Sequence, residues 1–172
     1  MNAEEKPALR QAPDSAGWGE ELFDRPGHLI RRCYQITMAL HAEVMKDLGV
    51  TQLQYVVLRT IRHHPGESQR RLGELAGLDR TTVGWVVVNL ENKGLLRRHA
   101  DGADRRHKPL ALSPLGERKL AEMEPRVHAL QQHLLAPLDD DEKFALVQSL
   151  QKIVMAYNDY SRAPLRADTG AK

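Results

Sequence analysis

Residues 68–94, SQRRLGELAGLDRTTVGWVVVNLENKG, decide the fold of this protein. Ser68 is placed to cap a short helix that Gly77 ends, because a serine oxygen accepts bonds from free backbone amides and glycine readily adopts the left-handed turn. Asp79 is placed to cap a second helix, whose inward positions recur every three or four residues at Val83, Val86, Val87 and Leu90. Two short helices joined by such a tight turn predict a helix-turn-helix.

Four more helices are predicted on either side of this pair. Apolar residues spaced three or four apart predict the first over about residues 29–49, and Thr51 with Gln54 forms a capping-box pair that opens the second. After the helix-turn-helix, Ser113 followed by proline is typical of a helix start. The acidic run at residues 139–142 favours the positive end of a last helix.

The hydrophobic period changes between these helices. Residues 95–99 and 108–112 are short runs of extended character around a charged tip at residues 100–107, ADGADRRH. We expect a two-stranded hairpin, which is too small to stand alone and must rest on the helices. The predicted fold class is therefore mainly α with a small two-stranded β wing: a winged helix-turn-helix with six helices and a helical dimerisation region.

One of the later helices carries an apolar seam that alternates steps of three and four, at Leu120, Met123, Val127, Leu130 and Leu134. This spacing lets a helix pair with another helix. We expect a second copy of the chain to cover the seam, and core packing within one subunit is the alternative. The seam therefore predicts a homodimer.

Charge is distributed unevenly along the chain. The 172 residues carry 25 lysines and arginines against 23 aspartates and glutamates, a net charge of +2. Residues 59–108 hold eleven of the basic and six of the acidic residues, so this segment is +5 and the remainder is −3. A helix of this size fits the major groove of DNA, and a narrow arginine-bearing loop suits the minor groove. A solvated charged face is the alternative, but the coincidence with a helix-turn-helix favours double-stranded DNA as the partner.

The composition also excludes several classes of protein. A single cysteine, Cys33, cannot form an internal disulfide. The sequence has no signal-like apolar region near its start and no run of about 18 apolar residues, so we expect a cytoplasmic protein with no membrane segment. It also has no glycine-rich phosphate loop, nucleophile elbow or metal-binding spacing, so we expect no enzyme activity, cofactor or bound metal.

Four blocks of the sequence, in order, resemble a known family. They are TQLQYVVL at residues 51–58, LAGLDRTTV at 75–83, LENKGL at 90–95 and DRRHKPLALS at 104–113. The last block matches the wing pattern D-x-R-x5-L-[ST] in full. Over about residues 25–160 the chain resembles the MarR family of winged helix-turn-helix transcription regulators. The resemblance implies a homodimer built from the first, fifth and sixth helices.

The resemblance also implies which residues meet DNA. The recognition-helix candidates, which lie away from its apolar side, are Arg80, Thr81, Thr82, Trp85 and Asn89. The candidates for phosphate contacts, at the start of the preceding helix, are Ser68, Gln69 and Arg70. In the wing, Asp104 would orient an arginine that enters the minor groove, either Arg106 or its neighbour Arg105, and a simple turn residue is the alternative for Asp104. Two such helices in a dimer, about 34 Å apart, would read a pseudo-palindrome.

Two positions depart from the family pattern, because Gly84 and Trp85 stand where members often carry a small polar residue and an arginine. Gly84 lowers helix propensity by about 1 kcal/mol relative to alanine, and we interpret it as serving a close approach to DNA. Trp85 either stacks on a sugar or reaches a thymine methyl, or it packs beneath a neighbouring loop. The sequence therefore leaves the operator open.

A small aromatic acid or phenolic compound is the effector that the resemblance implies. Residues 23–32, FDRPGHLIRR, are similar to regulators of aromatic-acid breakdown. His28, Arg32 and Gln35 share one flank of the first helix, where they suit a planar carboxylate. The candidates for covering its ring are Trp18, Phe23 and Tyr55. The alternative is a dimer salt bridge for Arg32 and a solvated His28.

A peroxide-sensing or metal-sensing repressor of the same fold is the alternative function. Cys33 lies on the apolar side of the first helix, where a cysteine is usually inert. The closest histidine pairs, His63 with His64 and His128 with His133, lack the spacing that aims two imidazoles at one ion. The sequence favours neither sensor.

These signals divide the chain into five segments. They are a flexible N-terminal arm at residues 1–22, a first dimerisation and ligand helix at 23–50, the winged helix-turn-helix DNA-binding domain at 51–113, C-terminal dimerisation helices at 114–162 and a disordered tail at 163–172.

Overall fold

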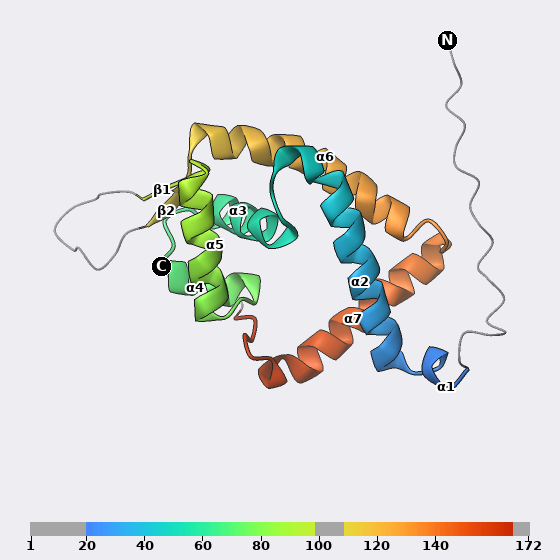
Figure 1. Cartoon of the computed structure of the whole chain (residues 1–172). Coiled ribbons are helices and arrows are strands. Elements are labelled where there is room, and N and C mark those ends of the chain that lie inside the picture. The colour runs from blue at the N-terminus through green and yellow to red at the C-terminus, as the bar shows by residue number, and fades with distance from the viewer. Residues whose placement is uncertain (1–19, 99–108, 167–172) are drawn as a thin grey trace, which may run out of the picture. The chain divides into compact units, whose positions relative to one another are not determined.

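The structure, a computed structural model, describes residues 20–98 and 109–166 and is mainly α-helical (Figure 1). The chain divides into two compact units, Met1–Met38 and Ala39–Lys172. Within the described residues the helices are α1 (Glu20–Phe23), α2 (Pro26–Val44), α3 (Gln52–His63), α4 (Gln69–Ala76), α5 (Arg80–Asn92), α6 (Pro114–Leu134) and α7 (Asp140–Tyr157). Short 3-10 turns follow α2 and α7, at Lys46–Leu48 and Asn158–Tyr160. No helix in the described ranges has the length and hydrophobicity needed to cross a bilayer.

The helix-turn-helix forms as its sequence predicts. The Ser68 hydroxyl oxygen accepts a backbone amide of the first turn of α4 at 3.2 Å. Gly77 ends α4 in the left-handed conformation, with a φ of 65°, which glycine adopts without a steric penalty. Asp79 then caps α5 by accepting the amides of Thr81 and Thr82, each at 2.9 Å.

The core of the second unit is built around one face of α5. Its inward side chains are at most 1% exposed: Val83, Val86, Val87 and Leu90. In the same core lie the buried hydrophobic side chains of α3, which are Tyr55, Val57, Leu58 and Ile61. Full burial of one such aliphatic side chain stabilises the fold by about 1.5–3 kcal/mol relative to exposure. The apolar face of α5 is therefore fixed against α3, and the opposite face stays outward.

The predicted hairpin is confirmed. Strand β1 (Leu96–Arg98) pairs antiparallel with β2 (Leu110–Leu112), and Leu96 stands opposite Leu112. Leu96, Leu110 and Leu112 are buried in the same core as α5, so the base of the wing is anchored on the helices. The wing tip, residues 99–108, lies outside the described residues.

The seam on α6 packs inside the chain. Leu120 and Met123 are fully buried, and Leu130 is 4% exposed. Helix α6 lies against α3 and β2 of the same chain, and Leu120, Met123 and Val127 belong to that core. The prediction that a second copy covers this seam is therefore wrong, because the periodicity marks a buried stripe without telling which element buries it.

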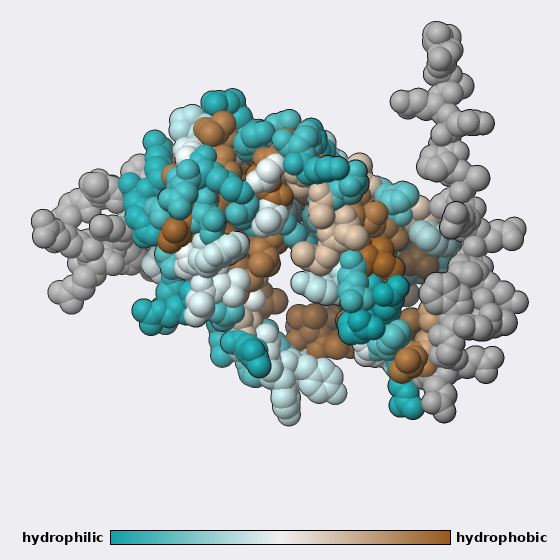
Figure 2. Space-filling model, viewed as in Figure 1, coloured by the Kyte–Doolittle hydropathy of each residue, from teal (hydrophilic) through white to brown (hydrophobic). Residues whose placement is uncertain are grey.

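Helix α7 has the opposite character. None of its residues is buried, although apolar side chains extend along it, and hydrophobic surface lies at its position in the space-filling view (Figure 2). The exposed apolar residues of α7 are Phe144, Leu146, Val147, Leu150, Ile153, Val154, Met155 and Tyr157. An apolar surface of this kind typically marks an interaction site.

Residues 161–166 lie on the helix-turn-helix, and we call them the C-terminal strap. The Arg166 amide donates to the Glu74 carbonyl at 3.1 Å, and the Arg71 guanidinium donates to the Arg166 carbonyl at 3.2 Å. Both bonds join the strap to α4, which lies far away in the sequence.

The strap corrects the sequence prediction of a disordered tail over residues 163–172. Residues 163–166 are held by hydrogen bonds to their backbone, which composition does not reveal. Residues 167–172 lie outside the described part of the chain.

The first turn of α6 packs closely against the backbone at the start of the wing hairpin. Ser113 caps α6, its amide donates to the Leu95 carbonyl at 3.0 Å, and its hydroxyl donates to the Gly94 carbonyl at 2.6 Å. A Cβ on Gly116 would overlap the Leu95 carbonyl oxygen. Glycine is therefore required where α6 passes the start of the hairpin.

Replacing Gly116 by alanine should destabilise the fold, because the added methyl group meets backbone atoms that have no room to move. Overpacking of this kind costs about 1–3 kcal/mol, so we expect a lower midpoint of urea unfolding with an unchanged slope. Gly84→Ala is the matched control, since its Cβ would lie 3.4 Å from the flexible Gln69 side chain. That variant should gain about 0.5–1 kcal/mol of helix stability. Equal midpoints for the two variants would contradict the packing described.

Candidate nucleic-acid interface

The outward face of α5 presents Arg80, Thr81, Trp85 and Val88 to solvent. Within the described part of the chain, Trp85 is 61% exposed and Val88 is 51% exposed. The sequence predicted Arg80, Thr81 and Trp85 as contact residues but missed Val88, although its position off the core stripe was an available signal. Exposed apolar side chains on a helix whose other face is buried indicate a contact surface.

Two other predicted contact residues of α5 are engaged within the helix. The Thr82 hydroxyl donates to the Asp79 carboxylate at 2.7 Å, and the Asn89 amide donates to the Trp85 carbonyl at 2.8 Å. The hydroxyl and amide of Thr82, followed by the amide of Thr81, lower the pKa of the Asp79 carboxyl, which is therefore ionised at neutral pH. Thr82 and Asp79 thus secure the first turn from which Arg80 and Thr81 project.

The start of α4 lies next to this face of α5. Ser68 uses its side-chain oxygen as the helix cap, and the Arg70 side chain is 84% exposed. The Gln69 side chain contacts both β1 and α5. Its Oε1 accepts a bond from Arg98 of β1 at 3.5 Å, and its Nε2 lies beside Gly84 of α5. Free amides at a helix start attract phosphate. Gln69 and Arg70 therefore border the surface that α5 presents.

Some basic residues of the +5 segment serve the fold. Arg98 of β1 forms a two-pronged ion pair with Glu91 of α5, with N–O distances of 2.6 and 3.0 Å. The Lys93 ammonium donates to the Gly49 carbonyl at 2.6 Å and to the Gln54 side chain at 2.9 Å. These cations tie the wing and the end of α5 to the core, so the segment offers less unpaired positive charge than its sum indicates.

The wing residues predicted to enter a minor groove, Asp104, Arg105 and Arg106, lie outside the described residues. The strand that leads toward them is described as far as Arg98, and Arg97 beside it is exposed. The roles of the three wing residues stay a prediction.

Most of the predicted effector residues lie in the unit Met1–Met38. Arg32 donates through Nη1 to Oε1 of Gln35 at 3.0 Å, and both side chains are exposed. His28, one turn earlier on α2, is half-buried, and Phe23 at the end of α1 is 41% exposed. Trp18 lies outside the described residues. The structure thus brings together the guanidinium and amide that the sequence predicted as neighbours.

Tyr55, the remaining effector candidate, belongs to the other unit and is buried in its core. Its hydroxyl accepts a bond from Arg59 at 3.4 Å. The same unit holds a polar group that sequence reasoning missed: His41 is buried, and its Nδ1 has no hydrogen-bond partner among the described residues. Burial lowers the pKa of His41, so its imidazole is neutral at pH 7. A histidine inside the apolar spacing of the first helix was the signal for it.

Cys33 is exposed on α2, as are its apolar neighbours Ile30, Tyr34 and Ile36. Cys33 is therefore exposed rather than buried among apolar side chains, as its place on the apolar spacing had suggested. Across residues 20–98 and 109–166, no three His, Cys, Asp or Glu side chains gather in a group that would hold a metal ion.

The segment that carries this surface matches a known family. The profile of the MarR family matches residues 50–108. "Transcriptional regulator HosA" of Escherichia coli O157:H7 is 32% identical over 133 residues, which are 77% of this chain and 97% of that protein. "HTH-type transcriptional repressor NicR" of Pseudomonas putida is 27% identical over 134 residues, which are 78% of this chain and 85% of that protein.

Solved structures share the fold. The PcaV transcriptional regulator from Streptomyces coelicolor, in complex with its natural ligand, has a TM-score of 0.69 and 33% identity and covers 86% of this chain and 99% of its own. BpsR of Bordetella bronchiseptica, whose DNA binding is regulated by 6-hydroxynicotinic acid, has a TM-score of 0.71 and 32% identity and covers 76% of this chain and 93% of its own. Because relatives match over most of their length and the family profile falls on the helix-turn-helix, this chain belongs to the MarR family of transcriptional regulators.

Proposed function

We propose that this chain is a homodimeric repressor that binds a pseudo-palindromic DNA operator and is released from it by a small aromatic carboxylate or phenolic compound. The outward face of α5, which stands beside the start of α4, is the observation that carries the DNA-binding part of the proposal. A helix whose opposite face is buried in the core can present its outward side chains to the major groove of DNA. NicR is a repressor, and an aromatic acid regulates the DNA binding of BpsR.

The contacts divide by chemistry. Arg70 and Arg80 are exposed cations beside helix starts, so we assign them to phosphates. Trp85 and Val88 are exposed and apolar, which suits thymine methyl groups or sugars in the major groove. The wing arginine Arg106 is assigned to the minor groove, where negative potential is enhanced. Phosphate contacts set the position on the duplex, and α5 supplies the sequence preference.

Trp85→Ala and Arg106→Ala should therefore change DNA binding in different ways. Trp85→Ala should cost about 1–3 kcal/mol of discrimination between the DNA upstream of the protein's own gene and a shuffled duplex. Arg106→Ala should weaken both complexes similarly and reduce the salt slope by about one per subunit. Fluorescence anisotropy at several salt concentrations measures both effects. If Trp85→Ala lowers both affinities by the same factor, Trp85 does not read bases.

Exposed apolar side chains on α7 and α2 support the dimer. Helix α7 has no buried residue within the chain, and α2 exposes Ile30, Tyr34 and Ile36. A second copy would remove this apolar surface from water, whereas the α6 seam needs no partner. Two-fold symmetry then requires two α5 helices that read half-sites about one helical turn apart.

Leu150→Asp should separate the dimer without unfolding the chain, because Leu150 is 41% exposed on α7 within one chain. A charge at a covered apolar contact costs desolvation energy that is absent in the free monomer. We expect a monomeric mass by light scattering, an unchanged helical circular dichroism signal and loss of tight operator binding. Ser149→Asp introduces the same charge at an exposed polar position and should remain dimeric. A dimeric Leu150→Asp variant that binds normally would remove α7 from the interface.

Polar side chains on one flank of α2 support the effector site. The Arg32 guanidinium and the Gln35 amide already lie 3.0 Å apart, with the half-buried His28 one turn away. A guanidinium binds a carboxylate through paired charge-assisted bonds, and the imidazole and amide supply hydrogen bonds to ring substituents. Ligand binding near the dimerisation helices would release DNA if it favours a spacing of the two α5 helices that does not fit the operator.

A thermal-shift screen with aromatic acids and hydroxypyridine carboxylates should find a stabilising ligand. At about 100 times the dissociation constant the stabilisation is about 2.7 kcal/mol. The effector should also weaken the operator complex, and by linkage operator DNA should weaken the binding of that ligand by the same factor. Arg32→Ala should abolish the shift, and Arg31→Ala, also exposed on α2, should retain it. Peroxide and zinc are included in the screen. If peroxide or zinc shifts the melting temperature and no acid does, the aromatic effector is wrong. The protein would then be a peroxide or a zinc sensor, according to which of the two acts.

A further inference from the structure

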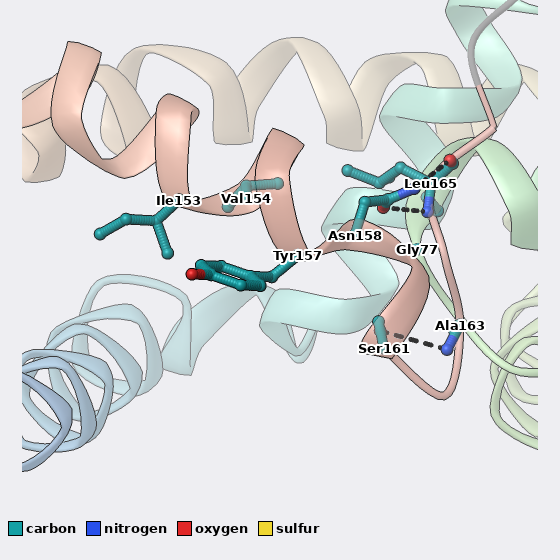
Figure 3. A pocket seen from close by; sticks show the side chains of 9 residues that line it. Gly77, Ile153, Val154, Tyr157, Asn158, Ser161, Ala163 and Leu165 are labelled. Carbon is teal, nitrogen blue, oxygen red and sulfur yellow. Dashed lines mark hydrogen bonds between the residues drawn. The ribbon is translucent and has the colours of Figure 1, made fainter.

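The C-terminal strap is held in a defined conformation by Asn158, which follows α7. The Asn158 side chain accepts the Leu165 amide at 2.8 Å through Oδ1 and donates to the Leu165 carbonyl at 3.0 Å through Nδ2 (Figure 3). Ser161 accepts the Ala163 amide at 3.2 Å within the same loop. Because these bonds engage the backbone, the Arg162 side chain is not among the groups that hold the strap.

The strap lies against the turn of the helix-turn-helix. The side chain of Leu165 stands so close to Gly77 that a Cβ on this glycine would lie 3.2 Å from Cδ2 of Leu165. Gly77, the strap and the apolar end of α7 line a pocket of about 410 Å³ (Figure 3). The strap is therefore bonded to α4 and packs on the turn that leads into α5.

On its other side the strap forms one wall of a basic groove of about 310 Å³. The arginines that line it are Arg70 of α4, Arg80 of α5, and Arg162 and Arg166 of the strap. Arg70 and Arg80 belong to the DNA interface proposed above. The strap thus adds two guanidinium groups at the border of that interface.

The acidic residues near the groove are already engaged. Asp79 caps α5, and Glu74 pairs with Arg70 at 3.4 Å and with Arg71 at 3.3 Å. Asp159 pairs with Arg166 at 3.4 Å.

Arg80 and Arg162 are the groove's unpaired cations. Both are exposed, and neither has a carboxylate partner in the part of the chain that the structure describes. Two unpaired cations that line one groove attract an anion to it.

We propose that Arg162 is a phosphate-binding residue of the DNA interface and that the strap holds it beside Arg80 for this purpose. The inference rests on the proposed DNA binding and extends its surface beyond α4, α5 and the wing. Exposed arginines bind a single small anion weakly, whereas each phosphate contact to a duplex gains from the release of condensed counterions. The groove therefore suits the DNA backbone.

The test compares Arg162→Ala with Arg118→Ala on a random-sequence duplex of about 30 base pairs, because phosphate contacts do not depend on sequence. Arg118 is also exposed but lies on α6, which packs against α3 and β2. For a dimer, Arg162→Ala should reduce the slope of log affinity against log salt by about 1.8, which is about 0.9 per phosphate. Arg118→Ala should leave the slope unchanged. Equal slopes for the two variants would overturn the proposal.

A double-mutant cycle tests the role of the strap. Asn158→Ala removes the two bonds to Leu165 and should by itself reduce the salt slope. In that background Arg162→Ala should have no further effect. If Arg162→Ala still reduces the salt slope in the Asn158→Ala background, the Arg162 charge acts without the strap holding it in place. That result would contradict the proposal. A wild-type protein with no salt-dependent DNA binding would refute the proposed function itself, whereas wild-type binding with an inert Arg162 refutes only this inference.

Discussion

Val83, Val86, Val87 and Leu90 bury one face of α5 in the core, and this packing fixes the direction of every other side chain on the helix. The cap at Asp79 fixes where α5 begins, so Arg80 and Thr81 project from its first turn. Side chains at fixed helical spacing meet a duplex without being ordered first, which lowers the entropic cost of binding. The candidate DNA surface is thus a consequence of the core beneath it.

The described neighbours of α5 hold the helix and leave Trp85 and Val88 on its outward face exposed. At its end, the ion pair of Arg98 with Glu91 joins it to the wing, and Lys93 joins it to the loop before α3. At its start, the strap packs on the turn at Gly77. Arg98 and Lys93 hold these elements together. We therefore propose that unpaired arginines such as Arg80, rather than the net charge of the segment, supply the contacts to DNA.

The sequence predicted the elements whose signals are local. The caps at Ser68 and Asp79 and the turn at Gly77 act within a few residues, and helical spacing alone placed Arg80 and Trp85 outward. The sequence could not predict which element packs on each apolar helix face. The apolar seam of α6 is buried by other parts of the same chain, whereas α7 has no buried residue. The strap was missed because it is held by bonds to its backbone, including one between residues 95 positions apart. The ion pair of Arg98 likewise depends on how β1 meets α5.

The central claim is that two copies of α5, related by two-fold symmetry, contact DNA through their outward faces. Hydroxyl-radical footprinting on the DNA upstream of the protein's own gene tests it most directly, because the method resolves protection nucleotide by nucleotide. The account predicts two equivalent protected patches on one face of the duplex, with centres about 10 base pairs apart. A single patch, or protection without a two-fold relation, would contradict it.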